Sequence, residues 1–430
     1  MWLNSALPRL SGWIVHSMHR VTAIDGAVPP AGPVLLVANH PSGLIDPLVV
    51  TVAARRPLRW LSKSTLVFHP LLGWLFRAVG CIPVYRRQDD PALMDKNAEA
   101  FRAAAEALAA GSAVAMFPEG ISHHSPGLAP MKTGAARLAL ATATHLGGAF
   151  PIIPIGVIYR DAPTFRSEAG IVVGSPVTWD DLAGAGAESR DTALELTRRI
   201  GDDLAGVTRN LGTWADQSLV EHAAAVLAAQ SPEGSTPPSW IARGSQILTR
   251  MDAADDPVLP TLRQRVRVHA RALRRLDLTP SQLTGTTPAR LPRYWRGWRA
   301  PLAALIWLIG RVWTWVPYRL TGAVASRLAP DQDTLATFKA AIGIVFFSLW
   351  IVLTAVLVGR TAGAMWGWLA VPAGTALAFL TLRLEEAREM TRAAERASVW
   401  RERRSVALET LREEQRELAR DLEAVVDRAD

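Results

Sequence analysis

Cysteine is almost absent from this sequence, which has a single thiol, Cys81, in 430 residues. One cysteine excludes a disulfide framework and a zinc site built from several thiolates. Lysine is also scarce, because only 4 of the 47 basic residues are lysines. The first twenty residues lack the uninterrupted apolar run of a secretory signal peptide. We therefore expect a chain that needs no oxidising compartment and begins directly with its mature N-terminus.

Apolar residues, by contrast, are abundant. They make up 49% of the chain, which has 16 tryptophans, whereas charged residues make up only 20%. This balance excludes an intrinsically disordered protein. The length suggests two or three structural units, and the net charge of +8 favours anionic partners. Membrane contact is expected from these values.

Residues 21–230 alternate short apolar runs with alanine-rich stretches. The runs are bounded by glycine or proline, as buried strands are, and the stretches have helical spacing. This pattern predicts an α/β domain with a mostly buried central sheet flanked by helices. Residues 1–20 form an amphipathic helix that either packs on this domain or lies on a bilayer. The expected strands are 34–38, 113–117, 152–157 and 171–173, and the expected helices are 91–111, 134–146 and 192–230.

The C-terminal half is predicted to be helical and membrane-bound. Residues 231–239 have the composition of a linker, and residues 240–300 combine arginines with tryptophans, which suits lipid headgroups better than nucleic acid. Residues 301–338 are interrupted by Arg311 and Pro317, which favours interfacial or re-entrant helices. Two uncharged stretches then predict a transmembrane hairpin, residues 340–382, with spans at 340–358 and 361–382.

Basic residues set the expected orientation of this hairpin. They flank both outer ends, whereas the intervening turn has only Arg360, so both ends are expected in the cytosol. Residues 383–430 are highly charged and contain neither glycine nor proline. A seam from Leu408 to Val425 is compatible with a coiled coil, which would make the protein a homo-oligomer, or with a single solvated helix.

The strand at 34–38 leads into a segment with catalytic character. His40 follows its end, where α/β proteins place reactive groups, and Pro41 favours the first position of a helix. An imidazole there can accept a proton from a hydroxyl, and Asp46 could hold its tautomer. A hydrogen-bonded structural histidine and a turn aspartate are the alternative interpretation.

Three further segments follow in order: Gly80 to Arg87, Phe117 to Gly120, and Ile153 to Val157. Together with the His40 segment, this set resembles the glycerolipid acyltransferase superfamily, which includes 1-acylglycerol-3-phosphate and glycerol-3-phosphate acyltransferases. The resemblance covers residues 21–178. It implies an O-acyltransferase that needs no metal or tightly bound cofactor and uses acyl-CoA or acyl carrier protein as co-substrate.

The resemblance also implies roles for individual residues. His40 would be the general base and Asp46 its orienting partner. Arg86 would bind the acceptor phosphate, and Glu119 with Gly120 would position the acceptor. Two lysines are similar to family positions that line the phosphate site, namely Lys63 and Lys132.

One feature departs from the commonest family pattern. Five residues rather than four separate His40 from Asp46, so a straight helix cannot carry both, and Gly43 is expected to absorb the extra residue. This spacing is more similar to the branch with fungal-type glycerol-3-phosphate and dihydroxyacetone-phosphate acyltransferases. His123 and His124 are adjacent and point apart, which favours a structural role in the loop over a metal or nucleophile site.

The sequence therefore predicts an integral membrane enzyme of phospholipid synthesis. It would acylate glycerol 3-phosphate or 1-acylglycerol 3-phosphate at the inner, cytoplasmic membrane or its equivalent, with the catalytic domain in the cytosol. Two alternatives remain at this stage: an enzyme that remodels other lysophospholipids, and a catalytically silent membrane scaffold.

Overall fold

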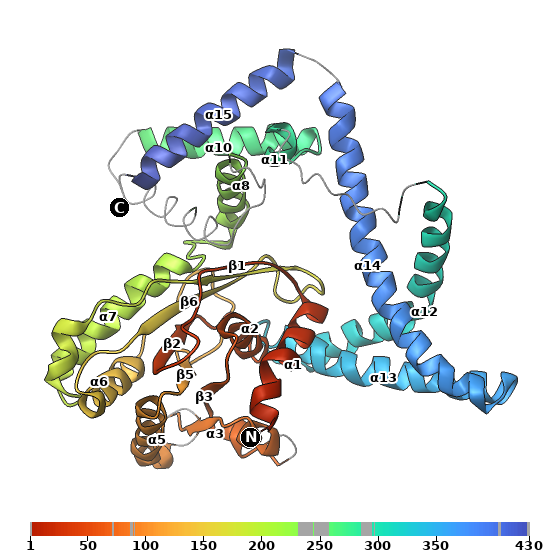
Figure 1. Ribbon diagram of the computed structural model, residues 1–430. Coiled ribbons are helices and arrows are strands. Elements are labelled where there is room, and N and C mark those ends of the chain that lie inside the picture. Colours follow the sequence, from red (N-terminus) through yellow and green to blue (C-terminus); the bar gives the residue numbers. More distant parts are fainter. Residues whose placement is uncertain are drawn as a thin grey trace. The chain divides into compact units, whose positions relative to one another are not determined.

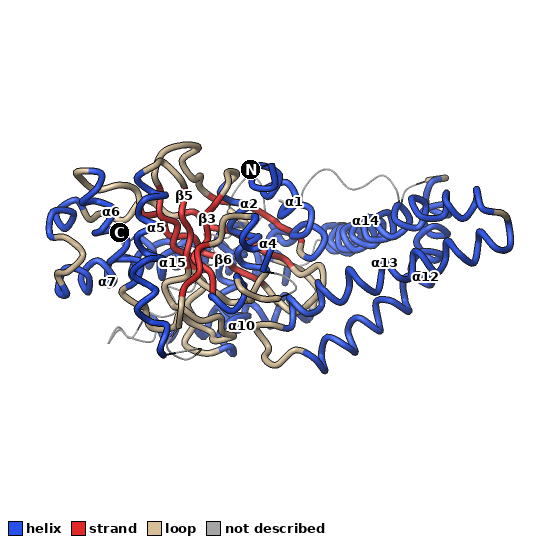
Figure 2. Tube along the Cα trace, turned by 90° about the horizontal axis from the view of Figure 1, so that it is seen from below, coloured by secondary structure: helices blue, strands red, loops and turns tan. Residues whose placement is uncertain are grey.

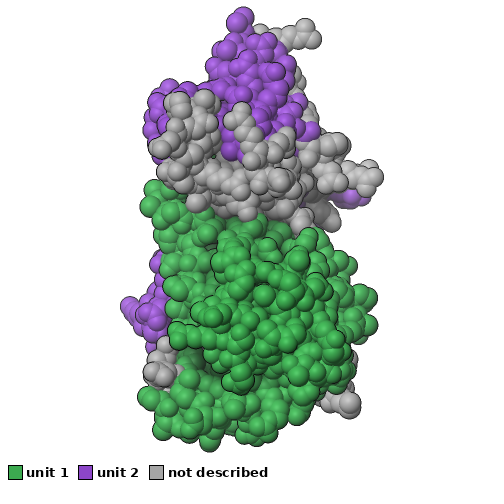
Figure 3. Space-filling view, turned by 90° about the vertical axis from the view of Figure 1, so that its left-hand side faces the viewer, with its two compact units in different colours: residues 1–220, 237–253 green, residues 221–236, 254–430 purple. Residues whose placement is uncertain are grey.

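The computed structural model describes residues 2–70, 73–86, 89, 91–230, 244, 258–284, 295, 297–402 and 406–427. Its described residues divide into two compact units (Figure 3). Unit 1 comprises residues 1–220 and 237–253, and unit 2 comprises residues 221–236 and 254–430. The predicted linker at 231–239 lies outside the described residues, as do residues 240–243, 245–257, 285–294 and 296 of the predicted basic segment at 240–300.

Unit 1 is built on a seven-stranded sheet with the order β1-β7-β6-β2-β5-β3-β4. All neighbouring strands are parallel except β6 and β7, which are antiparallel. β2 and β5 are buried at every residue, as apolar strands covered on both faces must be. The predicted α/β class is confirmed. The strands are β1 Arg20–Asp25, β2 Val34–Ala38, β3 Leu58–Lys63, β4 Ile82–Val84, β5 Ala113–Met116, β6 Ile152–Tyr159 and β7 Glu168–Val173.

Helices cover both faces of this sheet (Figures 1 and 2). α1 and α2 pack together on one face, and α5, α6 and α7 form the layer on the other. The helices of unit 1 are α1 Trp2–Met18, α2 Ile45–Ala54, α3 Ser64–Val67, α4 Gly73–Ala78, α5 Asn97–Ala109, α6 Gly134–Leu146 and α7 Arg190–Val207, with short 3₁₀ helices η1 Pro91–Lys96, η2 Asp180–Ala185 and η3 Trp214–Asp216.

The N-terminal helix packs on the domain. Ser11 and Val15 of α1 are fully buried, and the helix contacts α2 and β1. Trp13 is 61% exposed on the opposite side. Of the two alternatives for this helix, packing on the domain is therefore the one that the structure supports.

The prediction of one continuous helix at 192–230 is wrong. Two helices, α7 and α8 Gln217–Ala228, are separated by residues 208–216. α7 ends at Val207, and the next residue, Thr208, has the extended backbone of a chain that has left the helix. Alanine-rich sequence favours helix on both sides but does not specify this break.

Unit 2 contains long helices that are apolar enough to cross a membrane. By length and composition, three segments qualify among the described residues: 299–328, 335–362 and 364–392. They belong to α12 Arg299–Leu328, α13 Leu335–Ala362 and α14 Ala364–Glu402. The prediction of separate short pieces within 301–338 is wrong, since α12 runs through Arg311 and Pro317 without interruption.

The apolar seam of the C-terminal helix α15 Val406–Asp427 packs against other helices of the same chain. Gln415, Leu418 and Leu422 are buried, and the Gln415 side chain donates a hydrogen bond to the Pro280 carbonyl oxygen at 3.1 Å. The partners of α15 are α10 Val258–Arg275 and α11 Pro280–Thr284. The seam is thus neither a solvated face nor free for a second chain, and the expected boundary at 383 lies inside α14, which extends to Glu402.

Candidate active site

His40 lies just beyond the carboxyl end of β2, a central strand of the sheet. The preceding residue, Asn39, joins β2 to β6. Its side-chain oxygen accepts from the Val157 backbone N–H at 2.7 Å, and its amide donates to the Val157 carbonyl oxygen at 3.0 Å. These two hydrogen bonds hold the backbone of residue 39 against β6, and they therefore fix the position from which the His40 backbone continues.

The segment after His40 is a turn and not the start of a helix. α2 begins only at Ile45, so the prediction that Pro41 opens a helix is wrong. Gly43 has a φ of +49°, in the left-handed region that glycine adopts at little cost. The extra residue between His40 and Asp46 is accommodated in this turn, as the sequence analysis expected of Gly43.

The turn brings His40 and Asp46 together. The His40 Nδ1 atom lies 2.8 Å from Asp46 Oδ2, and the Asp46 side chain is fully buried. The imidazole also stacks on the Phe117 ring, with 3.8 Å between centroids and 6° between planes. With Nδ1–H donated to the carboxylate, Nε2 is the basic nitrogen of the ring. The predicted pair therefore has the geometry of a general base and its orienting carboxylate.

Two further donors reach the Asp46 carboxylate. The Ser42 backbone N–H donates to Oδ2 at 2.7 Å, and the Tyr159 hydroxyl donates to Oδ1 at 2.8 Å. Both donors stabilise the negative charge of Asp46, because a buried carboxylate without hydrogen bonds has a high free-energy cost. Tyr159 is a residue that the sequence analysis missed, because it lies 113 positions from Asp46.

Glu119 holds the backbone around His40. Its side chain is fully buried. Oε1 accepts from the His40 N–H at 2.9 Å, while Oε2 accepts from the Ala129 N–H at 2.7 Å and from His123 Nε2 at 2.5 Å. The His123 N–H in turn donates to the His40 carbonyl oxygen at 3.1 Å. His123 thus has the structural role expected of it, and direct positioning of an acceptor by Glu119 stays a prediction.

The remaining predicted binding residues form what we call the cationic cluster, Lys63, Arg86 and Lys132, around Gly120. Arg86 Nη1 donates to the Gly120 carbonyl oxygen at 3.4 Å. A Cβ atom on Gly120 would lie only 2.7 Å from Lys132 Nζ, so the missing side chain lets the lysine approach. Arg86 and Lys132 of the cluster thus border the loop whose Glu119 accepts the His40 N–H.

One carboxylate occupies the cationic cluster. Asp89 accepts two hydrogen bonds from Arg86, at 2.8 and 3.1 Å, and lies 3.6 Å from Lys63 Nζ. These hydrogen bonds from the Arg86 guanidinium lower the pKa of the Asp89 carboxyl. Asp89 shows that this arrangement of cations binds an anionic group of two oxygens.

A cavity of about 390 Å³ has His40 in its lining. Its lining does not include the cationic cluster. Trp214 stacks with His124, with 4.7 Å between centroids, and the Arg209 guanidinium lies 5.4 Å from the Trp214 ring centre. The lining consists of residues 39–41, 119, 123–128, 157–162, 209, 214 and 217. Sequence reasoning missed Arg209 and Trp214 because they follow the recognised segments and carry no motif.

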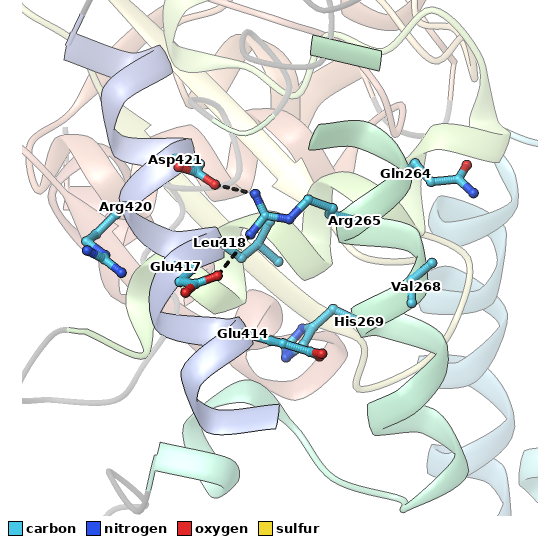
Figure 4. A pocket seen from close by; sticks show the side chains of 9 residues that line it. All are labelled: Gln264, Arg265, Val268, His269, Glu414, Glu417, Leu418, Arg420 and Asp421. Carbon is cyan, nitrogen blue, oxygen red and sulfur yellow. Dashed lines mark hydrogen bonds and ion pairs between the residues drawn. The ribbon is translucent and has the colours of Figure 1, made fainter. Parts of the chain in front are cut away.

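A second cavity, of about 570 Å³, lies within unit 2 between α10 and α15 (Figure 4). Arg265 reaches across it to Asp421 and Glu417. His269, beside it, receives a hydrogen bond from or donates one to His222, with 2.9 Å between nitrogens. This cavity contains none of the predicted site residues. Within the described ranges, no group of three or more potential metal-ligating side chains occurs.

Comparisons with known proteins place the His40 region in context. The family model described as Acyltransferase matches residues 18–158. The chain is 34% identical over 117 residues to glycerol-3-phosphate O-acyltransferase 2 of Saccharomyces cerevisiae, covering 26% of this chain and 16% of the yeast protein. It is 34% identical over 131 residues to lyso-ornithine lipid O-acyltransferase of Pseudomonas aeruginosa, covering 30% of this chain and 45% of that protein.

Two other proteins are similar to part of the chain. A probable 1-acyl-sn-glycerol-3-phosphate acyltransferase of Mycoplasma genitalium is 29% identical over 155 residues, which is 35% of this chain and 53% of that protein. A solved 1-acyl-sn-glycerophosphate acyltransferase from Thermotoga maritima aligns at 19% identity with a TM-score of 0.34, covering 47% of this chain and 80% of that one. This chain thus aligns with about half or less of each of the three curated relatives.

Proposed function

Because residues 18–158 form an acyltransferase domain of the glycerolipid acyltransferase family, we propose that this protein transfers a fatty acyl group from a thioester to a hydroxyl of glycerol 3-phosphate or 1-acylglycerol 3-phosphate. The contact between His40 Nδ1 and the buried Asp46 carries the proposal. It provides a base at the end of a central strand, in the lining of a cavity. The proposed thioester is acyl-CoA or acyl carrier protein.

The proposed reaction is a direct transfer. His40 Nε2 takes the proton of the acceptor hydroxyl while the hydroxyl oxygen attacks the thioester carbonyl carbon. The tetrahedral intermediate collapses, the carbon–sulfur bond breaks, and the thiolate receives the proton from the His40 imidazolium. Asp46 keeps its negative charge throughout and stabilises the imidazolium. An ester and a free thiol result, and His40 returns to its starting state.

The cationic cluster is proposed to hold the acceptor phosphate. A phosphate monoester presents several oxygens, and the Arg86 fork suits two of them. Asp89 now accepts both Arg86 hydrogen bonds, so the phosphate would replace this carboxylate as their acceptor. The cavity with His40 in its lining would then receive the thioester arm of the donor, which brings the carbonyl carbon and the hydroxyl to the same imidazole.

The test of this function is an acyl-transfer assay with the purified full-length chain in lipid nanodiscs. Glycerol 3-phosphate, 1-acylglycerol 3-phosphate and a lyso-ornithine lipid are offered in parallel, each with acyl-CoA and with acyl carrier protein. We expect ester formation with one of the two phosphorylated acceptors. Turnover of the lyso-ornithine lipid alone would support a remodelling enzyme, and no turnover with any pair would support the scaffold.

The packing of unit 2 supports a proposal for the membrane topology. α10 precedes the three apolar helices and α15 follows them, yet Arg265 of α10 pairs with Asp421 of α15, and Leu273 packs with Leu408. Both helices must lie on one side of the membrane, so the chain between them crosses an even number of times. We propose that α13 and α14 cross and α12 does not.

Composition supports this choice of α12. Its best window has a mean hydropathy of 1.3, against 1.4 for the window in α14 and 2.7 for the window in α13, so it is Arg311 and not hydropathy that separates α12 from α14. Arg311 lies at the middle of α12 and is 3.8 Å from Glu385, just after the uncharged stretch of α14. The sequence from 221 to 258 has no apolar run long enough to cross, which supports a catalytic domain on the same side of the membrane as α10 and α15. Arginine flanking of the spans supports the cytosol as that side.

We expect single cysteines to report this topology. The changes Arg271→Cys in α10, Arg360→Cys in the last turn of α13 and Arg420→Cys in α15 are made one at a time in a Cys81→Ser background. An impermeant maleimide should label the first and third from one face of sealed vesicles and the second from the other face. Labelling of positions 271 and 420 from opposite faces would show three crossings and contradict the proposal.

A further inference from the structure

Tyr159 contacts the Asp46 carboxylate at the oxygen that does not face His40. It is the last residue of β6 and lies one position beyond the segment that the family model matches. Its hydroxyl donates to Asp46 Oδ1 at 2.8 Å, while Oδ2 of the same carboxylate faces His40 Nδ1 at 2.8 Å. The two oxygens of Asp46 thus have different partners from different elements.

The surroundings of Tyr159 ensure that its hydroxyl stays a donor. The side chain is almost fully buried, and burial, together with the Asp46 charge, raises the pKa of Tyr159 well above its usual value. His19 packs against the ring, with 5.0 Å between centroids, and burial lowers the pKa of His19 to about 4. At neutral pH the histidine is therefore uncharged, and a protonated phenol faces the carboxylate.

Asp46 needs a contact outside the turn that joins it to His40, so that its carboxylate keeps one orientation. A carboxylate on a side chain with two rotatable bonds can turn its oxygens away from the imidazole unless both are held. The Ser42 N–H and His40 both bind Oδ2, so neither constrains Oδ1 directly. Among the contacts that fix Asp46, only the Tyr159 hydroxyl comes from a different part of the sheet, at the end of the rigid strand β6.

We propose that Tyr159 is a positioning residue of the acyl-transfer site, which orients Asp46 so that Oδ2 faces His40 and tempers the charge that the carboxylate presents to the imidazole. The inference rests on the proposed function, since it assumes that His40 is the base. Tyr159 acts through Asp46, because its hydroxyl donates to the carboxylate that faces His40.

Several other titratable groups face this site, and apart from Asp46 their residues are left unchanged in every variant that the test uses. They come from every element packed around His40 and Tyr159. They are Asp46 on α2, Glu119 and His123 in the loop after β5, His19 after α1, and Arg160 and Asp161 after β6.

The test is Tyr159→Phe, which keeps the ring and removes the donor. We expect kcat to fall about tenfold while the KM of the acceptor changes less than twofold, because a lost hydrogen bond to a charged group has roughly this effect. The acidic limb of the kcat/KM profile should move to higher pH, since a carboxylate without its phenol donor stabilises the His40 imidazolium more strongly.

The matched control is Thr142→Val, which removes a buried hydroxyl bound to the Leu138 carbonyl oxygen in α6, away from the site. It should lower the thermal midpoint as Tyr159→Phe does and leave the pH profile unchanged. A second comparison uses Asp46→Asn with and without Tyr159→Phe. If Tyr159 acts through Asp46, the second change adds nothing to the loss in rate.

Each result has a definite meaning. Wild-type kinetics and pH profile in Tyr159→Phe, or additive losses in the double variant, would overturn the inference while leaving the proposed function intact. Should Tyr159→Phe not fold, 3-fluorotyrosine at position 159 keeps the shape and makes the phenol a stronger donor, so the acidic limb should move to lower pH. An unmoved limb there would also overturn the inference. Failure of the proposed function appears separately, as absence of turnover in the wild-type protein.

Discussion

Replacing His40 by glutamine is expected to reduce acyl transfer by at least about 1000-fold in kcat. General-base catalysis by a positioned side chain contributes roughly this factor, and glutamine keeps polar atoms without a basic nitrogen. The measurement is single-turnover ester formation with saturating donor and acceptor in nanodiscs. Because the imidazole stacks on Phe117 and is only partly exposed, the variant should also be checked by thermal unfolding.

His145→Gln is the matched control for this change. His145 lies in the last turn of α6, is exposed and has no part in the site. It should leave kcat within about twofold of the wild type, since surface changes away from special contacts have small effects. A folded His40→Gln variant with substantial turnover would remove His40 from the role of base and leave the dyad as a structural hydrogen bond.

Replacing Arg86 by alanine should lower kcat/KM for a phosphorylated acceptor by about 100-fold. The loss corresponds to about 2–3 kcal/mol, which is typical of a two-pronged hydrogen bond to a charged group. Turnover of an acceptor without phosphate should stay within a few fold of the wild type, because His40 and the donor cavity are unchanged. The measurement is a comparison of both acceptors at several concentrations.

Arg102→Ala provides the control for charge alone. Arg102 is exposed on α5, and its removal changes the net charge by the same amount as Arg86→Ala. It should weaken acceptor binding only slightly, through long-range attraction that salt screens. Equal losses for both acceptors in Arg86→Ala would indicate that the arginine supports the loop through Gly120 and Asp89, and that the phosphate binds elsewhere.

Local signals predicted most of the elements that frame the site. The buried runs at 34–38 and 113–117 became β2 and β5, and the helix predicted at 134–146 became α6 with the same bounds. The type of each segment could be predicted because the spacing of its apolar residues matches the period of only one kind of element. The strands β1, β3 and β4 were missed. β1 and β4 are the two edges of the sheet and β3 pairs with β4, and strands in such positions are less apolar and are defined by the neighbours that they pair with.

The seam of α15 shows the limit of the same reasoning. Its spacing of Leu408, Leu418 and Leu422 correctly indicated a buried face, yet a periodic pattern does not name the surface that buries it. The structure provides α10 and α11 of the same chain as that surface. The same packing supports the proposed topology of two crossings, which the sequence also predicted, because it keeps α10 and α15 together.

The sequence by itself determined the α/β class, the membrane-spanning capacity of the C-terminal half and the identity of His40 and Asp46 as partners. Composition, hydrophobic periodicity and short-range motifs carry these properties, and they are local. Tertiary structure alone decided that Tyr159 reaches Asp46, that Glu119 holds the backbone at His40, and that Asp89 lies among the cations. The first two depend on strands and loops far apart in the chain, and Asp89 depends on how its turn folds back on Lys63 and Arg86, so none follows from local pattern.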